Sequence, residues 1–163
     1  MSVGHRVSTD RQLARLLQIG VVLEEVVEVR AARHYETLSP DERDADIEEL
    51  LAEAREESAD HRERLEALVD RLDADPVPLS EVEALVEAHY AQTRPEDFDG
   101  ILYDQLNGEE TAYKFYDDLI EAIESNDATF GLDREELLDT LKEIREEEAE
   151  GVEEVAAVME ARE

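Results

Sequence analysis

Apolar residues recur every three or four positions along most of this chain, which is the spacing of amphipathic α-helices. The first such stretch follows capping residues at 8–10 and ends at Leu38. The second opens with a capping box at 39–42, which places Pro40 in the first turn, and continues to about Leu72. No useful length of chain alternates with a period of two residues, so the pattern predicts no strands.

Two further long helices are predicted in the second half. One covers residues 98–124, and Asp133 is the expected N-cap of another that runs nearly to the end. Short connections within each pair predict two antiparallel hairpins, at about 10–72 and 98–161. The crossover at 73–97 contains a short helix that Ser80 caps and that extends to about Gln92. We therefore expect one all-α domain with the two hairpins and long crossover of a ferritin-like four-helix bundle.

The charge of the chain is strongly one-sided, with 47 Asp and Glu against 16 Lys and Arg and a formal net charge of −31. Such self-repulsion is screened at molar salt, so we expect the cytoplasmic protein of a salt-accumulating halophile. The charge excludes nucleic-acid binding, which needs clustered cations. The absence of cysteine excludes disulfides and rubredoxin-type iron sites. The first twenty or so residues contain no long apolar run, so we predict no signal peptide and no membrane span.

The two halves of the chain resemble each other. Residues 28–38 align without gaps to residues 109–119, an offset of 109 − 28 = 81. Residues 55–59 match residues 145–149 at an offset of 145 − 55 = 90. Together the two matches indicate a duplicated helical hairpin.

Glu109 is the most informative residue, because it lies inside an apolar stripe between Leu102, Leu106 and Tyr116. An ionised carboxylate in such a position costs several kcal/mol unless a cation or strong donors compensate it. The repeat places Glu28 at the equivalent position of the first half. Two carboxylates that converge inside a helical bundle suit a hard or borderline divalent metal.

The spacing from Glu28 to Tyr35 equals that from Glu109 to Tyr116, and in this the chain resembles the rubrerythrin-type proteins of the ferritin-like superfamily. The resemblance implies a Glu on the first and third long helices and a Glu-x-x-His motif on the second and fourth. Together these six ligands bind two iron or manganese ions.

This chain keeps four of the six ligands that the resemblance implies. His61 matches the His of the second helix, but Ser58 stands where its Glu is expected. Glu148 matches the Glu of the fourth helix, but Gly151 stands where its His is expected. The ligand set it implies is Glu28, His61, Glu109 and Glu148, with Glu57 as a substitute for the missing Glu.

Two classes of function remain open at this point. One is an iron-binding redox protein, a peroxidase or ferroxidase that takes electrons from a separate donor. The other is a metal-free bundle that serves as a structural or interaction module, and in either case we expect a homodimer. Ordinary structural roles also remain open for the candidate residues. Glu57 and Glu148 could belong to a solvated face, and His61 could serve packing. The remaining candidates could be core tyrosines (Tyr35, Tyr113 and Tyr116) and surface or supporting acids (Glu24 and Glu25).

Overall fold

Five helices make up the part of the chain that the computed structural model describes, residues 7–37, 45–90 and 98–161. They are α1 (Asp10–Thr37), α2 (Ala45–Asp70), α3 (Leu79–Tyr90), α4 (Phe98–Glu124) and α5 (Arg134–Glu160). No strand occurs within these ranges, so the prediction of an all-α fold is confirmed for them. The bounds of α4 are those predicted, whereas the capping box at 39–42 and the end of the short helix near Gln92 lie outside the described residues.

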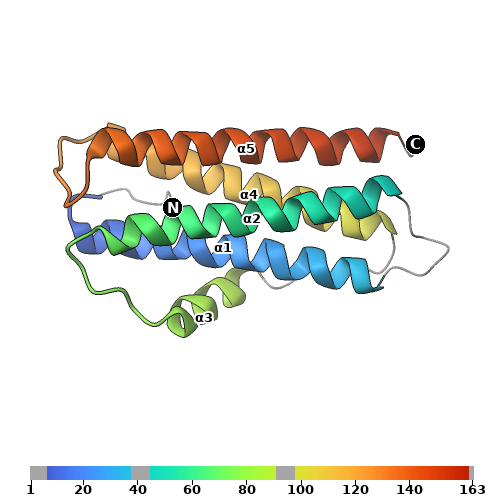
Figure 1. Ribbon diagram of the computed structural model, residues 1–163, viewed down its shortest axis with the longest axis horizontal. Coiled ribbons are helices and arrows are strands. Elements are labelled where there is room, and N and C mark those ends of the chain that lie inside the picture. The colour runs from blue at the N-terminus through green and yellow to red at the C-terminus, as the bar shows by residue number, and fades with distance from the viewer. Residues whose placement is uncertain (1–6, 38–44, 91–97, 162–163) are drawn as a thin grey trace.

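The four long helices lie side by side, and the short helix α3 lies against α1 (Figure 1). The closest pairs are α1 with α2 and α4 with α5, and these pairs meet through α1 with α4 and α2 with α5. Each long helix runs antiparallel to the two that it contacts (Figure 1). The chain that joins α2 to α4 therefore crosses from one end of the assembly to the other.

Local hydrogen bonds explain where two of the helices begin. The Thr9 hydroxyl accepts from Gln12 N at 3.1 Å and the Gln12 side chain accepts from Thr9 N at 3.2 Å, which is a capping box. The Asp133 carboxylate accepts from Glu136 N, so the predicted cap of α5 is confirmed. Asp10, the first residue of α1, accepts from the backbone N–H groups of Asp73 at 2.8 Å and Gly131 at 3.0 Å. One carboxylate thus joins the start of α1 to the chain that follows α2 and to the α4–α5 connection.

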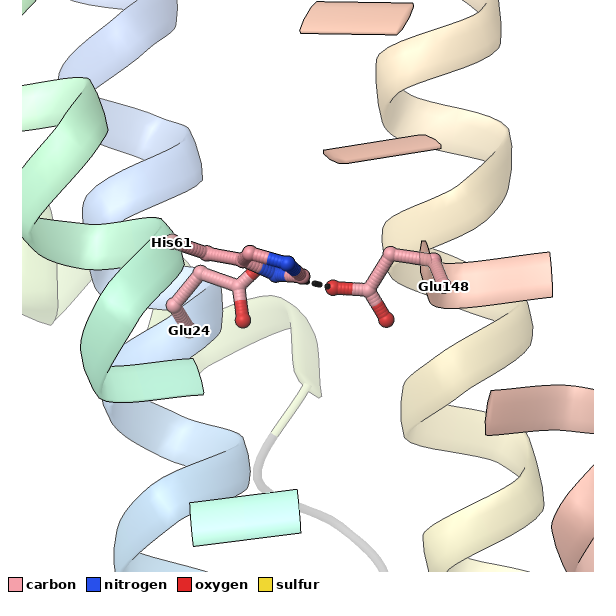
Figure 2. Close-up of side chains that lie close together, drawn as sticks. All are labelled: Glu24, His61 and Glu148. Atoms are coloured by element: carbon pink, nitrogen blue, oxygen red, sulfur yellow. Dashed lines mark hydrogen bonds and ion pairs between the residues drawn. The ribbon is translucent and has the colours of Figure 1, made fainter. Parts of the chain in front are cut away.

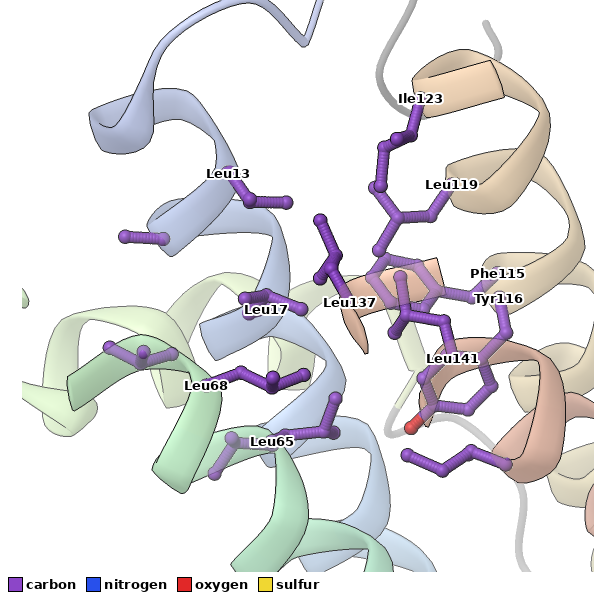
Figure 3. Close-up of a cluster of buried hydrophobic side chains, with 14 of the residues drawn as sticks. Leu13, Leu17, Leu65, Leu68, Phe115, Tyr116, Leu119, Ile123, Leu137 and Leu141 are labelled. Atoms are coloured by element: carbon purple, nitrogen blue, oxygen red, sulfur yellow. The ribbon is translucent and has the colours of Figure 1, made fainter. Parts of the chain in front are cut away.

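The apolar core forms two clusters along the length of the helices. The larger cluster lies at the end where α1 and α5 begin, and Figure 3 shows side chains from all four long helices meeting there. Its members include Leu17, Leu65, Leu119 and Leu141. The smaller cluster lies toward the other end and contains Ala31, Ile47, Leu50, Leu51, Leu102 and Val155. Each of the four helices contributes polar residues between these two clusters, and that intervening segment holds the candidate site.

The crossover is fixed to α1 by polar contacts. Gln18, which is 3% exposed, donates to the carbonyl of Val77 at 2.8 Å and accepts from its N–H at 3.3 Å. Val82 of α3 is buried in the larger cluster.

Among the described residues, no helix combines the length and the apolar character that a membrane span requires.

Replacing Leu17 by Ala should lower the free energy of unfolding by about 2 to 5 kcal/mol, because Leu17 is fully buried and the truncation leaves a cavity. Leu79→Ala is the matched control, since Leu79 is 39% exposed and its truncation should change stability by no more than about 0.5 kcal/mol. Chemical unfolding in molar KCl measures both. Equal losses in the two variants would contradict this position of the core.

Candidate metal centre

Six buried polar residues form a layer between the two apolar clusters. We call this set the buried polar layer, and it consists of Glu24 on α1, Ser58 and His61 on α2, Gln105 and Glu109 on α4, and Glu148 on α5. Each is at most 5% exposed. Three carboxylates and an imidazole are thereby removed from water in one region, which is costly unless they compensate one another or bind a cation.

His61 lies at the centre of this layer and contacts carboxylates through both ring nitrogens. Its Nδ1 lies 3.2 Å from Glu24 Oε1 and 3.1 Å from Glu148 Oε1. Figure 2 shows these two carboxylates beside the ring of His61, with Glu24 extending from α1 and Glu148 from α5. Its Nε2 lies 2.5 Å from Glu147 Oε2 and 4.0 Å from Glu57 Oε1, on the outer side of the ring. His61 therefore connects two deeply buried acids with two that are about one-third exposed.

Glu24 is the most deeply buried carboxylate of the layer. The hydroxyl of the fully buried Tyr116 donates to Glu24 Oε1 at 2.6 Å, and the same oxygen faces His61. The second oxygen, Oε2, is buried without any hydrogen-bond partner. A buried carboxylate oxygen without a partner is uncommon and points to a ligand that would satisfy it.

Glu109 and Glu148 form a second group with Glu57. Gln105 Nε2 donates to Glu109 Oε1 at 3.1 Å, and Glu109 is hydrogen-bonded to Glu148. Glu57, Glu109 and Glu148 each place one carboxylate oxygen within 4.8 Å of the others. Glu24, His61 and Glu148 satisfy the same condition, so Glu148 belongs to both groups.

The electrostatics of the layer shift the pKa values of its acids in opposite directions. Burial alone would raise the pKa of Glu24, but hydrogen bonds from His61, Glu148 and Tyr116 outweigh it and lower that pKa below its ordinary value. Burial and then the charge of Glu24 hold the pKa of Glu148 well above its ordinary value. Burial is also the main cause of the raised pKa of Glu109. The pKa of Glu24 is therefore lowered, whereas those of Glu109 and Glu148 are raised.

Two groups at the outer side of the layer titrate near or above neutral pH. Burial, followed by the charge of Glu109, raises the pKa of Glu57 to about 8. Burial would lower the pKa of His61, but hydrogen bonding and charge attraction from Glu24, with further contributions from Glu147 and Glu57, raise it to about 9. In the metal-free protein His61 is thus an imidazolium that donates from both nitrogens.

Comparisons with protein-family models, with curated protein sequences and with solved structures found no match to this chain. The assignment of the site therefore depends on its own geometry.

The structure brings together four of the five residues predicted as ligands: His61, Glu109 and Glu148 in the buried polar layer, and Glu57 at its edge. A solvated face no longer describes Glu148, which is 3% exposed. Of the three tyrosines, Tyr116 is a core residue, whereas Tyr113 is 38% exposed. The side chain of Tyr35 lies outside the described set.

Glu28, the fifth predicted ligand, is not part of the layer. It is half-buried, and its Oε2 accepts from Arg62 Nη1 at 2.6 Å. Glu24, one helical turn earlier, takes the inward position instead and is only 1% exposed, so the expectation of a surface position is wrong for it. The repeat offset of 81 pairs Glu28 with Glu109. The inward face of α1 passes through Glu24 instead, one turn earlier than that pairing predicts.

A signal for Glu24 was present in the sequence. Leu17, Glu24 and Ala31 follow one another at intervals of seven residues, and both flanking residues are fully buried. The same interval, two helical turns, separates Glu109 from Leu102 and from Tyr116 and identified it as a core carboxylate. Applied to the first helix, that criterion selects Glu24.

Gly151 and Glu109 are sterically linked. A Cβ atom on Gly151 would lie 2.6 Å from Glu109 Oε2 and 2.9 Å from Glu109 Cδ. Glu109 thus occupies the space that a His at position 151 would need. The missing His of the fourth long helix and the placement of Glu109 are one structural feature rather than two.

The pKa shifts predict how the stability of the metal-free protein depends on pH. Because the pKa of His61 rises from 6.5 unfolded to about 9 folded, its stabilisation is complete below pH 6.5 and is lost as the pH rises through 9. The raised pKa of Glu57 acts in the same direction between pH 4.5 and 8. For His61 we expect a loss on the order of 3 kcal/mol, since its pKa rises from 6.5 to about 9 and one pKa unit is worth about 1.4 kcal/mol.

Denaturant unfolding in molar KCl with a chelator, followed from pH 6.5 to 9, measures this loss. A His61→Gln variant is the control and should show a flatter dependence, because it has no imidazole to deprotonate. Parallel curves for the two proteins would contradict the raised pKa of His61.

Proposed function

We propose that this protein is a ferritin-like four-helix bundle that binds a divalent transition metal, with iron as the first candidate and manganese as the second, in its buried polar layer. The observation that carries the proposal is Glu24 Oε2, a fully buried carboxylate oxygen with no partner. Since the pKa of Glu24 is lowered, this oxygen carries negative charge and a cation is its natural complement.

The donor set supports a metal of borderline hardness. Glu24, His61 and Glu148 offer two carboxylates and one imidazole nitrogen, a combination that suits iron, manganese or zinc. Nδ1 of His61 faces this group, whereas the Nε2–H can continue to donate to Glu147. Hydrogen bonding of the outer nitrogen to a carboxylate orients a metal-binding histidine and makes it a stronger ligand.

Because Glu148 belongs to both ligand groups, the buried polar layer offers ligands for two ions. Glu57, Glu109 and Glu148 form the second potential ligand group, and a carboxylate common to both groups would bridge the ions. The two groups are unequal, because only the first contains a nitrogen ligand. We therefore propose a first ion at Glu24, His61 and Glu148, and a weaker second position at Glu57 and Glu109.

An oxidoreductase activity with peroxide or oxygen is the further step that a ferritin-like iron site implies. When bound, iron would supply the one-electron chemistry, and three protein ligands would leave coordination positions open. Tyr116 would hold Glu24 in position through its hydroxyl. The separate electron donor, the homodimer and the cytoplasmic location in a salt-rich cell stay predictions.

A metal-free structural bundle is the second candidate, and one observation favours it. The pKa of His61, about 9, makes the ring itself a cation between Glu24 and Glu148 at neutral pH. In this candidate, the positive charge of His61 rather than a metal ion compensates the buried carboxylates. It leaves Glu24 Oε2 without a partner, however, and for that reason we place it second.

Glu24→Gln should abolish high-affinity metal binding, whereas Glu28→Gln should retain it. The two positions are one helical turn apart on α1, but only Glu24 belongs to the buried polar layer. The loss for Glu24→Gln should exceed the about 10- to 100-fold that is typical of residues that only orient a ligand. Equilibrium dialysis with ferrous iron under anaerobic conditions in molar KCl, followed by elemental analysis, counts metal per chain.

A Glu109→Ala variant in the same experiment distinguishes one ion from two. We expect it to keep the first ion and to lose the second, because Glu109 belongs to the second ligand group alone. Circular dichroism of each variant establishes that it is folded. Negligible metal in the folded wild-type protein would remove the metal-binding proposal and leave the structural bundle.

A further inference from the structure

We propose that divalent cations reach the buried polar layer from the face between α2 and α5, binding first at an outer site formed by Asp60, Glu147 and the outer side of His61. This inference rests on the proposed metal-binding function, because it concerns how the same site fills. It assigns a function to acids that contribute no ligand to the inner position.

The outer side of His61 has the donors of a transit site. Asp60, His61 and Glu147 place one ligand atom each within 4.8 Å of one another. Asp60 is 55% exposed and Glu147 is 35% exposed, so both are in contact with solvent. His61 is 0% exposed and its other nitrogen faces Glu24, whose Oε2 has no partner. The imidazole thus separates a solvent-accessible ligand group from a buried oxygen that lacks a partner.

Glu57 connects the outer side to the inner one. Its side chain is 32% exposed, and its Oε1 lies 4.0 Å from His61 Nε2. Glu57 also has a carboxylate oxygen within 4.8 Å of ligand atoms of Glu109 and Glu148. A cation can therefore pass from Glu147 to Glu57 and on to Glu148 by exchanging one carboxylate for the next, without losing all its protein ligands at any step.

The surface outside this group is an open groove with acidic walls. Its lining includes Glu143, Glu146, Glu147 and Glu150 of α5, with Arg64 and Lys142 as the basic members. A groove in which acids outnumber bases concentrates cations and raises their association rate. Glu147 belongs both to the groove and to the outer site, so the two adjoin each other.

Other described faces at this level are less suited to a cation. Between α1 and α2, the half-buried pair of Arg62 and Glu28, 2.6 Å apart, places a guanidinium near the surface. Between α1 and α4 there is a cavity of about 30 Å³, whose lining combines Leu23, Val26 and Val27 with neutral or basic polar residues such as Arg30 and Gln105. A hydrated divalent ion would lose water there without gaining carboxylate ligands. Of these three faces, the α2–α5 face offers acids from solvent to interior.

Arg64 occupies the outer site in the absence of a metal. Its guanidinium lies 3.2 Å from Asp60, 3.5 Å from Glu143 and 3.7 Å from Glu147. An incoming cation has to compete with this charge for the same carboxylates. Removal of Arg64 should therefore act in the opposite direction to removal of the acids, which a merely structural role of these residues would not produce.

The experiment measures the rate at which the metal-free full-length protein takes up Co²⁺ in molar KCl, by stopped-flow visible absorption, together with the number of ions bound at equilibrium. Asp60→Asn and Glu147→Gln should each slow uptake by about tenfold. Arg64→Gln should accelerate it. Glu66→Gln is the matched control, an exposed acid of α2 that does not line the groove, and should leave the rate unchanged.

Asp60→Asn is the decisive variant, because Asp60 belongs to neither inner ligand group and the number of ions bound should stay the same. Glu147→Gln should also weaken equilibrium binding, since Glu147 orients His61. Equal uptake rates in all variants, with normal occupancy, would overturn the route and leave the proposed metal site intact. Absence of bound Co²⁺ in the wild-type protein would overturn both.

Discussion

The structure depends on how a single ionised carboxylate, Glu24, is held away from water. Apolar clusters lie on both sides of it along the helices, so the surrounding solvent cannot compensate its charge. Tyr116 and His61 supply donors to one of its oxygens, and the other oxygen has none. After burial, the charge of Glu24 is also the next cause of the raised pKa of Glu148.

The layer is asymmetric although the two halves of the chain resemble each other. The first half contributes the imidazole of His61, whereas the second has Gly151, where Glu109 fills the available space. One group of potential ligands therefore contains a nitrogen, and the other contains carboxylates alone. This asymmetry is why the proposed binding of a first and a second ion differs in strength.

Much of the fold was predictable from the sequence because its causes are local. Seven-residue intervals of apolar side chains and the cap at Asp133 defined the helices, and these depend on neighbours within a few residues. The inward position of Glu109 followed in the same way. The selection of Glu28 over Glu24 failed because a repeat alignment tolerates a shift of one turn, while the packing of α1 against three other helices does not.

Other parts of the site were beyond sequence reasoning because they depend on tertiary contacts. Neither the shared position of Glu148 nor the partnerless oxygen of Glu24 has a sequence signature, since each arises where side chains from different helices meet. The same holds for Glu147, one of many acids along α5, whose contact with His61 requires the register between α2 and α5.

The carboxylate of Asp10 has a mechanical consequence. By accepting from both Asp73 and Gly131, it joins the two hairpins at the end where the larger apolar cluster also lies. The separation of the hairpins is therefore constrained twice at this end, by a shared carboxylate and by the larger cluster. At the opposite end the described contacts are those of the smaller cluster, which includes Leu102 and Val155.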